Sequence, residues 1–285
     1  MQTKPIFLLS CCFLLVFFSC NNQSENKSEA STETKMDSSK MPTSNTIKEE
    51  AVTYSAGSTN LKGYVAYDEN KRGKRPVVLV VPEWWGMTDY PRTRAKQLAD
   101  LGYFAMAVDM YGDGKVAADP KAAQEAAGPF YSNPQMGKER LDAALAKAKT
   151  FAQADSSQVA AIGYCFGGSM VLNYAKLGAP VAGVVSFHGG LQTVPPRKGT
   201  KAQFLICHGG ADSFVPQPQV DAFRKSMDSA GVAYTFNVYP NATHAFTNPA
   251  ATEVGKKFNM PISYNGAADT ASWNDMKAFF AKIFH

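Results

Sequence analysis

Residues 159–175 read VAAIGYCFGGSMVLNYA, an apolar run that leads through a glycine-framed cysteine into a helical pattern. The run up to Gly163 is typical of a strand that is covered on both faces. The glycines permit the tight turn that a strand needs before it enters a helix directly. Cys165 would then stand at the first turn of that helix, where the helix dipole and free backbone N–H groups favour a thiolate. The pattern G-Y-C-F-G-G over residues 163–168 therefore predicts a nucleophile elbow with sulfur in place of oxygen, the alternative being a core cysteine in a glycine-rich turn.

Apolar strands and helices alternate along the rest of the chain. Strands are predicted over residues 50–57, 61–68, 75–83, 103–112, 158–164, 181–190, 202–212 and 233–240. Helices are predicted over residues 89–102, 120–153 (with interruptions near Gly128 and Pro134), 217–231 and 270–284, and from Cys165 onward. This alternation indicates an α/β fold with a mostly parallel sheet of about eight strands, helices on both faces and no large lid domain. Ligands of such sheets bind at the carboxyl ends of the strands.

A nucleophilic thiol needs a base, and the base needs an acid to orient it. Asp212 follows one apolar strand in HGGADSFVP, and His244 follows the next strand in YPNATHAF. The order nucleophile, acid, base is the order of the α/β-hydrolase triad. Taken singly, Asp212 could cap a helix and His244 could be a surface loop residue. Together and at strand ends, they predict a triad with Cys165.

These motifs together resemble the dienelactone hydrolase family. G-Y-C-F-G-G is preceded by PEWWG and followed by HGGAD and ATHAF, and the resemblance covers residues 50–285. It implies an α/β-hydrolase fold and hydrolysis of an ester or lactone, with Cys165 as nucleophile, His244 as base and Asp212 as its orienter. It also implies that Glu83 hydrogen-bonds the resting thiol and shifts when substrate binds. A cap or a salt-bridge partner is the structural alternative for Glu83.

The oxyanion of such a reaction needs hydrogen-bond donors aimed at its developing charge. By the logic of the elbow, one donor is the backbone N–H of Phe166, and the other is expected from Trp84 in the loop after the third strand. The side chains of Trp84, Trp85 and Tyr164 are candidates for the substrate pocket, although aromatic residues more commonly pack in the core or at a rim. The mechanism needs no cofactor, and the sequence carries neither zinc-site histidine spacing nor a dinucleotide-binding fingerprint.

The founding members of the family grip a substrate carboxylate with two arginines, and neither arginine is present here. The segment VDMYGDGKVAADP after the fourth strand contains no arginine, and its Lys115 is only a weak substitute. Asn248 stands four residues after His244, where the second arginine would lie. Lysine and asparagine do not reproduce a bidentate guanidinium grip. We therefore expect a neutral or differently charged ester or lactone as substrate rather than dienelactone itself.

The N-terminal segment indicates export. A charged start and the apolar run PIFLLSCCFLLVFFS predict a signal peptide over residues 1–19. The small residue before Cys20 resembles a bacterial lipobox, although Phe17 stands where an aliphatic residue is usual. Simple secretion is the alternative. We expect lipid on Cys20 to anchor the protein to a bacterial cell envelope membrane, on the periplasmic or outer-surface side.

The predicted tether and domain follow the anchor. Residues 20–48 are rich in polar residues and have almost nothing to bury, which is typical of a disordered segment, and residues 49–285 form the hydrolase-like domain. Cleavage would leave 28 basic and 24 acidic residues, a net charge of +4. That charge is not clustered, so no nucleic-acid footprint is present. We expect a monomer whose partner is a small-molecule ester or lactone.

The remaining cysteine and histidines receive structural interpretations. Cys207 lies inside the apolar run FLICHGG and is expected to be buried and inert. With only two thiols outside the leader and Cys20, the chain has no disulfide framework. His188 and His208 stand beside glycines at strand ends and are expected to pack or to hydrogen-bond near the site.

Two other functions remain open from the sequence. A catalytically silent envelope protein of the same fold could bind a small molecule or a glycan, although such a binder has no need of a base-paired thiol. Thiol redox chemistry between Cys165 and Cys207 would require their Cα atoms to lie within about 7 Å.

Overall fold

The computed structural model describes residues 46–284. The predicted signal peptide, Cys20 and nearly all of the predicted tether lie outside the described residues. The first strand begins at Ile47, three residues before the predicted start of that strand at residue 50. Within residues 46–284, no helix has both the length and the apolar character needed to cross a membrane.

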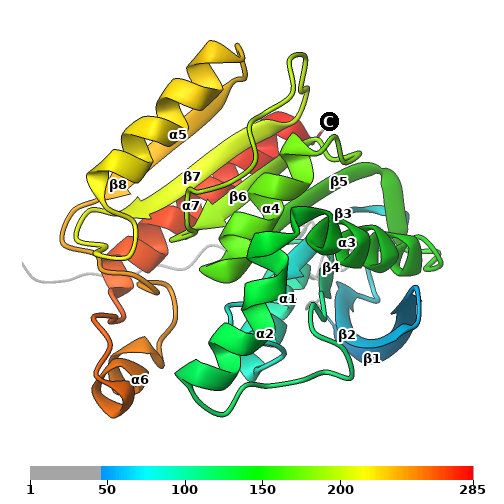
Figure 1. The fold of residues 1–285 in the computed structure, drawn as a ribbon. Coiled ribbons are helices and arrows are strands. Elements are labelled where there is room, and N and C mark those ends of the chain that lie inside the picture. The colour runs from blue at the N-terminus through cyan, green and yellow to red at the C-terminus, as the bar shows by residue number, and fades with distance from the viewer. Residues whose placement is uncertain (1–45, 285) are drawn as a thin grey trace, which may run out of the picture. The chain divides into compact units, whose positions relative to one another are not determined.

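Eight strands of the described residues form one sheet in the order β1-β2-β4-β3-β5-β6-β7-β8 (Figure 1). The strands are β1 Ile47–Ala56, β2 Thr59–Asp68, β3 Arg75–Val81, β4 Phe104–Ala107, β5 Ala154–Tyr164, β6 Gly183–Phe187, β7 Gln203–Gly209 and β8 Tyr234–Tyr239. β2 is antiparallel to β1 and β4, and all strands from β4 to β8 in this order run parallel. The predicted hairpin and the mostly parallel α/β sheet are confirmed.

The helices are α1 Asp89–Asp100, α2 Pro120–Ser132, α3 Pro134–Ala148, α4 Phe166–Lys176, α5 Gln217–Ser229, α6 Ala251–Phe258 and α7 Gly266–Ile283. The break predicted near Pro134 is correct, because Asn133 ends α2 and begins α3. The break predicted near Gly128 is wrong, since α2 continues through it. Helix α6 was not predicted; it is short and follows the loop that carries His244.

Each face of the sheet has its own apolar core. Val77, Leu79 and Val81 of β3 belong to a cluster that includes residues of α2, α3, α4 and α5, whereas Val78 and Val80 belong to a cluster that includes residues of α1 and α7. This division follows the alternation of side chains along a strand, and it explains why β3 is apolar throughout. In Figure 1, α4 crosses in front of the sheet and α7 passes behind it.

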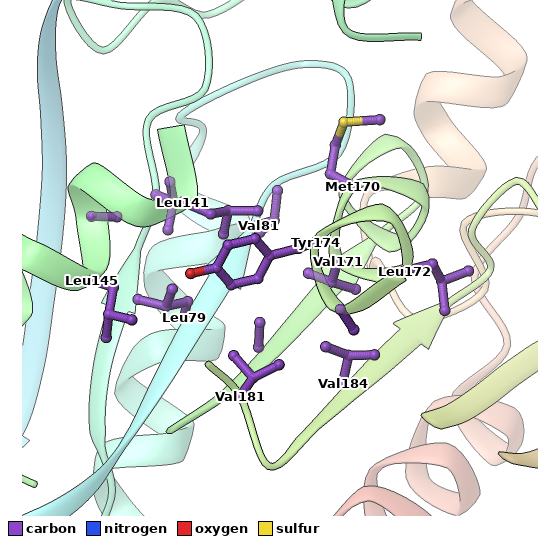
Figure 2. Packing of buried hydrophobic residues seen from close by; sticks show 14 of the residues in the cluster. Leu79, Val81, Leu141, Leu145, Met170, Val171, Leu172, Tyr174, Val181 and Val184 are labelled. Carbon is purple, nitrogen blue, oxygen red and sulfur yellow. The ribbon is translucent and has the colours of Figure 1, made fainter. Parts of the chain in front are cut away.

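Helix α4 is anchored by Tyr174, whose ring lies among Leu79, Leu141 and Leu145 (Figure 2). The Tyr174 hydroxyl leaves this apolar layer by donating to Oδ1 of Asp142 at 3.0 Å. A buried tyrosine with a partner for its hydroxyl combines a large apolar contact with a satisfied polar group. The contact holds α4, and therefore the residue that precedes its first turn, at a fixed place on the sheet.

The candidate residues gather at one edge of the sheet because five parallel strands or their extensions end there. Glu83 follows β3, Cys165 follows β5 and His188 follows β6. Asp212 follows β7 and His244 follows β8. This placement agrees with the rule that ligands of α/β sheets bind at the carboxyl ends of the strands.

The turn between β5 and α4 depends on direct backbone packing. A Cβ atom on Gly163 would lie 2.1 Å from the carbonyl oxygen of Gly167. A Cβ atom on Gly167 would lie 2.3 Å from the carbonyl oxygen of Val81, at the end of β3. Only glycine permits both approaches. The glycines of the elbow motif are therefore required by the packing of the turn against β3.

We expect Gly167→Ala to lower the free energy of unfolding by about 2–3 kcal/mol, because the added methyl would meet the backbone of β3. Gly128→Ala is the matched control, since a Cβ atom at Gly128 in α2 meets nothing within 4 Å. The control should raise the free energy of unfolding by about 0.5–1 kcal/mol through helix propensity. Urea denaturation of both variants measures the difference, and equal effects would contradict the packing argument.

Candidate active site

Cys165 sits in a strained conformation between β5 and α4, with φ 52° and ψ −114°. Residues with a side chain rarely adopt positive φ, and such a conformation persists only where the surroundings enforce it. Its backbone N–H donates to the carbonyl oxygen of Phe187 at 3.0 Å and to Nδ1 of His188 at 3.1 Å. The side chain is half-buried and borders a cavity of about 520 Å³. The thiol is thus presented to a cavity, as the elbow pattern predicted.

His244 and Asp212 form a buried pair. Nδ1 of His244 lies 2.8 Å from Oδ2 of Asp212, and the Asp212 side chain is fully buried. The other carboxylate oxygen, Oδ1, accepts the backbone N–H of Phe214 at 2.9 Å, so the carboxylate is fixed by its own loop. With Nδ1 engaged by Asp212, the imidazole turns its Nε2 edge to a second partner. The candidate partner is Cys165, which borders the same cavity as His244 and whose interaction with the imidazole raises the pKa of His244.

The interactions of His244 with Cys165 and Asp212 favour its protonated form. Burial alone would lower the pKa of His244, but interactions with Cys165 and Asp212 outweigh it and raise that pKa to about 10. The largest of the effects that raise this pKa comes from Cys165, so a negative charge on the sulfur favours the protonated imidazole. A protonated imidazole in contact with a thiol favours a thiolate–imidazolium pair, which is the reactive form of a nucleophilic cysteine.

Glu83 is held differently from the sequence-based expectation. Its Oε2 accepts a hydrogen bond from Nδ2 of Asn248 at 2.7 Å, and among the described residues no hydrogen bond joins it to Cys165. The expected bond to the resting thiol is therefore absent among the described residues, and Asn248 is the hydrogen-bond partner of the carboxyl group instead. Burial raises the pKa of Glu83 to about 7, against smaller opposing effects of Asn248, His244 and Arg94.

The two proposed oxyanion donors belong to separate segments of the chain. One directly follows Cys165, and the other borders the same cavity as Cys165. Phe166 is the first residue of α4, where helix geometry leaves the N–H without an intrahelical partner. Trp84 borders the same cavity as Cys165. The Trp84 carbonyl oxygen accepts from the Tyr111 hydroxyl at 2.9 Å, which ties the loop after β3 to the loop after β4.

A single carboxylate organises the loop after β4. Buried Asp109 accepts the backbone N–H groups of Lys62, Tyr111, Gly112 and Gly114 at 2.8–3.0 Å. A carboxylate with four N–H donors is a rigid centre for a loop that has no regular structure. It positions Tyr111, and through Tyr111 the backbone near Trp84. No local pattern in the sequence signalled this role for Asp109.

The cavity in front of Cys165 is predominantly apolar. Its size falls within the range of about 300–1,000 Å³ that is usual for sites of small organic ligands. The larger side chains that border it are Trp84, Trp85, Tyr131, Phe214, Met260 and Ile262. Among the described residues, no lysine or arginine borders it, and its ionisable side chains are Glu83, Tyr131, Cys165 and His244. The described residues therefore give the cavity no lysine or arginine that could bind a carboxylate.

Two of the weaker pocket predictions are wrong. Tyr164 is fully buried, and its ring stacks on Phe187 at 4.9 Å between centroids, so it belongs to the core beneath the site. The side chains of Tyr164 and Cys165 point to opposite sides, because successive side chains alternate at a strand end. Lys115 is exposed and does not border the cavity; its carbonyl oxygen instead accepts from Met87 at 3.2 Å. Trp85 does border the cavity, as predicted.

His188 lies behind the thiol and takes part in a buried chain of hydrogen bonds. Because its Nδ1 accepts the Cys165 N–H, its proton lies on Nε2, which is 2.7 Å from Oγ1 of Thr247. Thr247 is in turn 2.7 Å from the hydroxyl of Tyr90. Burial, followed by the charges of His244 and Arg94, lowers the pKa of His188 well below its usual range. A neutral imidazole here keeps the acceptor that the backbone of Cys165 uses.

His208 and Cys207 do not reach the cavity. The His208 ring packs against Phe236 with centroids 5.7 Å apart. Cys207 is fully buried, and burial raises the pKa of its thiol to about 12. Both residues agree with their structural interpretation.

Part of the cavity comes from segments that sequence reasoning did not assign to it. Tyr131 on α2 and Phe214 after Asp212 border the mouth, and both are about half exposed. Met260 and Ile262 come from the chain that follows α6. An isolated parallel bridge between His244 and Ile262 brings that chain to the site. No local sequence pattern could predict this contact, because it joins two irregular segments.

This fold and site define an α/β-hydrolase that presents a cysteine where many members present a serine. The family model described as the dienelactone hydrolase family matches residues 61–284. The chain therefore belongs to the dienelactone hydrolase family, which places it among hydrolases that act on ester and lactone bonds. The resemblance noted in the sequence is confirmed.

Individual relatives agree with this membership. A crystal structure of a dienelactone hydrolase-like promiscuous phosphotriesterase from metagenomic libraries is 34% identical, with a TM-score of 0.77, covering 84% of this chain and 99% of that one. A "Putative carboxymethylenebutenolidase" of Methylorubrum extorquens is 32% identical over 61% of this chain and 64% of its own length. A protein of the same name from Escherichia coli K12 is 26% identical over 78% of this chain and 82% of its own.

The raised pKa of Glu83 has a consequence for stability. Its carboxyl group titrates near 4.5 in an unfolded chain and near 7 in the folded protein. Between these values the folded state binds more protons than the unfolded state, so the free energy of unfolding falls as pH rises through this window. Relative to Glu83→Gln, which keeps an acceptor for Asn248, we expect wild type to lose about 3 kcal/mol between pH 4.5 and 7. Urea denaturation at several pH values measures this difference, and a pH-independent difference would contradict the shift.

Proposed function

We propose that the protein hydrolyses an uncharged ester or lactone through a covalent thioester on Cys165. The observation that supports it most is the connected set of side chains at the cavity. Asp212 binds Nδ1 of the His244 imidazole at 2.8 Å, and Cys165 borders the same cavity as His244 and raises the pKa of its imidazole. A protein that only bound a ligand would have no use for a thiol paired with an oriented, protonated imidazole.

In the first half-reaction, the Cys165 thiolate attacks the carbonyl carbon and forms a C–S bond. The backbone N–H groups of Phe166 and Trp84 stabilise the oxyanion, which carries the charge that the sulfur loses. His244 donates its Nε2 proton to the leaving oxygen as the C–O bond breaks. The alcohol leaves, or stays attached in a lactone, and the acyl group remains on sulfur as a thioester.

In the second half-reaction, neutral His244 accepts a proton from a water molecule that attacks the thioester carbon. The same two N–H groups hold the second oxyanion. When the C–S bond breaks, the acid leaves and the thiolate is restored beside the protonated imidazole. Asp212 stays ionised throughout, because its role is to orient the ring and to stabilise the imidazolium.

The lining of the cavity supports an uncharged substrate. Aromatic and aliphatic side chains border it, and the described residues place no lysine or arginine there. The position at which family members carry an arginine is Asn248, whose side chain is occupied by Glu83. A substrate carboxylate would meet no lysine or arginine and would lie near Glu83, so it would be disfavoured. Neutral phosphotriesters, the class that the metagenomic relative is named for, meet the same requirement.

Substitution of each of the two cysteines in turn tests the proposal. With short p-nitrophenyl esters, Cys165→Ala should lower kcat/KM by at least about 10³-fold, because the nucleophile is lost. Cys207→Ala, which removes the buried thiol, is the matched control and should retain turnover. Equal turnover in wild type and Cys165→Ala would exclude this mechanism, and no hydrolysis by either protein, with ligand binding undiminished by Cys165→Ala, would favour a ligand-binding role.

We also propose that the protein is exported and held at a cell envelope membrane by lipid on Cys20. The charged start, the apolar run and Cys20 support this, together with the polar segment that separates them from β1. In a bacterial host, wild type should incorporate radiolabelled palmitate and enter the detergent phase of a Triton X-114 extraction. Cys20→Ser should do neither, and labelling that survives this change would contradict the assigned site.

A further inference from the structure

A second hollow lies directly behind one wall of the cavity that contains Cys165. Its volume is about 370 Å³, compared with about 520 Å³ for the Cys165 cavity. Glu83 and Trp85 border both hollows. Since Glu83 is buried and bound to Asn248, the half-buried indole of Trp85 is the larger part of the partition.

The backbone that carries Trp85 is fixed. Its carbonyl oxygen accepts the N–H of Ala117 at 2.9 Å. The next residue, Gly86, has φ 81°, and a Cβ atom there would lie 2.2 Å from the carbonyl oxygen of Lys115. The main chain is therefore held against the loop after β4, and the position of the partition depends on the side chain alone.

The indole is held from two sides by other rings. Phe258, the last residue of α6, stacks on it with centroids 5.8 Å apart and an interplanar angle of 27°. Trp84 meets it edge-on at 5.2 Å. Helix α6 in turn packs closely on the chain that follows it, since a Cβ atom on Gly255 would lie 2.5 Å from the carbonyl oxygen of Ile262. The wall is thus a packed element, assembled from the loop after β3 and from α6.

The second hollow fits an uncharged chain rather than an ion. Ala117, Val254 and Phe258 give it an apolar surface, and Thr88 and Asn248 provide polar groups at one side. Among the described residues, no lysine or arginine borders it, and the side chain of Asp89 at its rim is fully exposed. Both hollows therefore suit the same chemical class, a neutral and mainly apolar group.

We propose that Trp85 sets the acyl-length limit of the Cys165 site, by closing it against a second hollow that would otherwise accept the far end of a longer uncharged chain. This inference rests on the proposed esterase function and deepens it. Wild type is restricted to short acyl groups because the indole occupies the passage. Removal of the indole joins the hollows and lets a medium-length chain extend past Glu83 toward α6.

The test compares p-nitrophenyl acetate, butyrate and octanoate on the full-length protein, with one detergent throughout. The measured quantity is the ratio of kcat/KM for octanoate to kcat/KM for acetate, because a general loss of activity cancels in it. Trp85→Ala should raise this ratio about tenfold or more through a lower KM for octanoate, since each methylene that gains a buried place strengthens binding several-fold. Trp85→Phe, which keeps a ring in the wall, is the matched control and should leave the ratio near that of wild type.

Phe258→Ala provides an independent variant, because it removes the packing partner of the indole without touching the loop that carries Trp84. It should raise the ratio by less than Trp85→Ala does. Labelling of Cys165 by iodoacetamide reports whether each variant keeps its site. If Trp85→Ala fails to fold, an unchanged ratio in Phe258→Ala overturns the inference. If wild type and Trp85→Ala both hydrolyse esters with the same ratio, the inference fails and the proposed function stands; if neither hydrolyses any ester, both fail.

Discussion

The site depends on the backbone contact between the turn at Cys165 and the end of β3. Gly167 lies so close to the carbonyl oxygen of Val81 that no side chain fits between them. This contact holds the first turn of α4 against the strand that leads to Trp84, and it places both candidate oxyanion donors beside one sulfur. Within the same turn, Cys165 has a positive φ, and its N–H donates to the carbonyl oxygen of Phe187 and to Nδ1 of His188.

The electrostatics follow from this geometry. The pKa of His244 is raised to about 10 despite its burial, because Cys165 and Asp212 both favour the protonated imidazole. The neighbouring ring of His188 has the opposite tendency, since it is buried beside two positive charges. Its centroid lies 5.3 Å from that of His244. The two adjacent histidines therefore differ: the pKa of His244 is raised, whereas the pKa of His188 is lowered and its Nδ1 accepts a backbone hydrogen bond.

Asn248 stands at the position where the founding members of the family carry an arginine, so this position brings no positive charge. Asparagine still binds Glu83 but brings no charge, so the carboxyl group is buried beside a neutral partner and its pKa rises to about 7. No lysine or arginine of the described residues borders the cavity, and its lining is mainly apolar. These features support the proposal that the substrate is an uncharged compound.

The residues alone determined the alternation of strands and helices, the elbow around Cys165 and the order of Asp212 and His244. They could do so because apolar periodicity, glycine spacing and strand ends are local properties. Only the tertiary structure decided that Tyr164 faces the core, that Lys115 stays outside and that Asn248 holds Glu83. It alone brought α6 against Trp85 and placed Asp109 at the centre of its loop. These contacts join segments far apart in sequence, and the packing that selects them is a property of the whole fold.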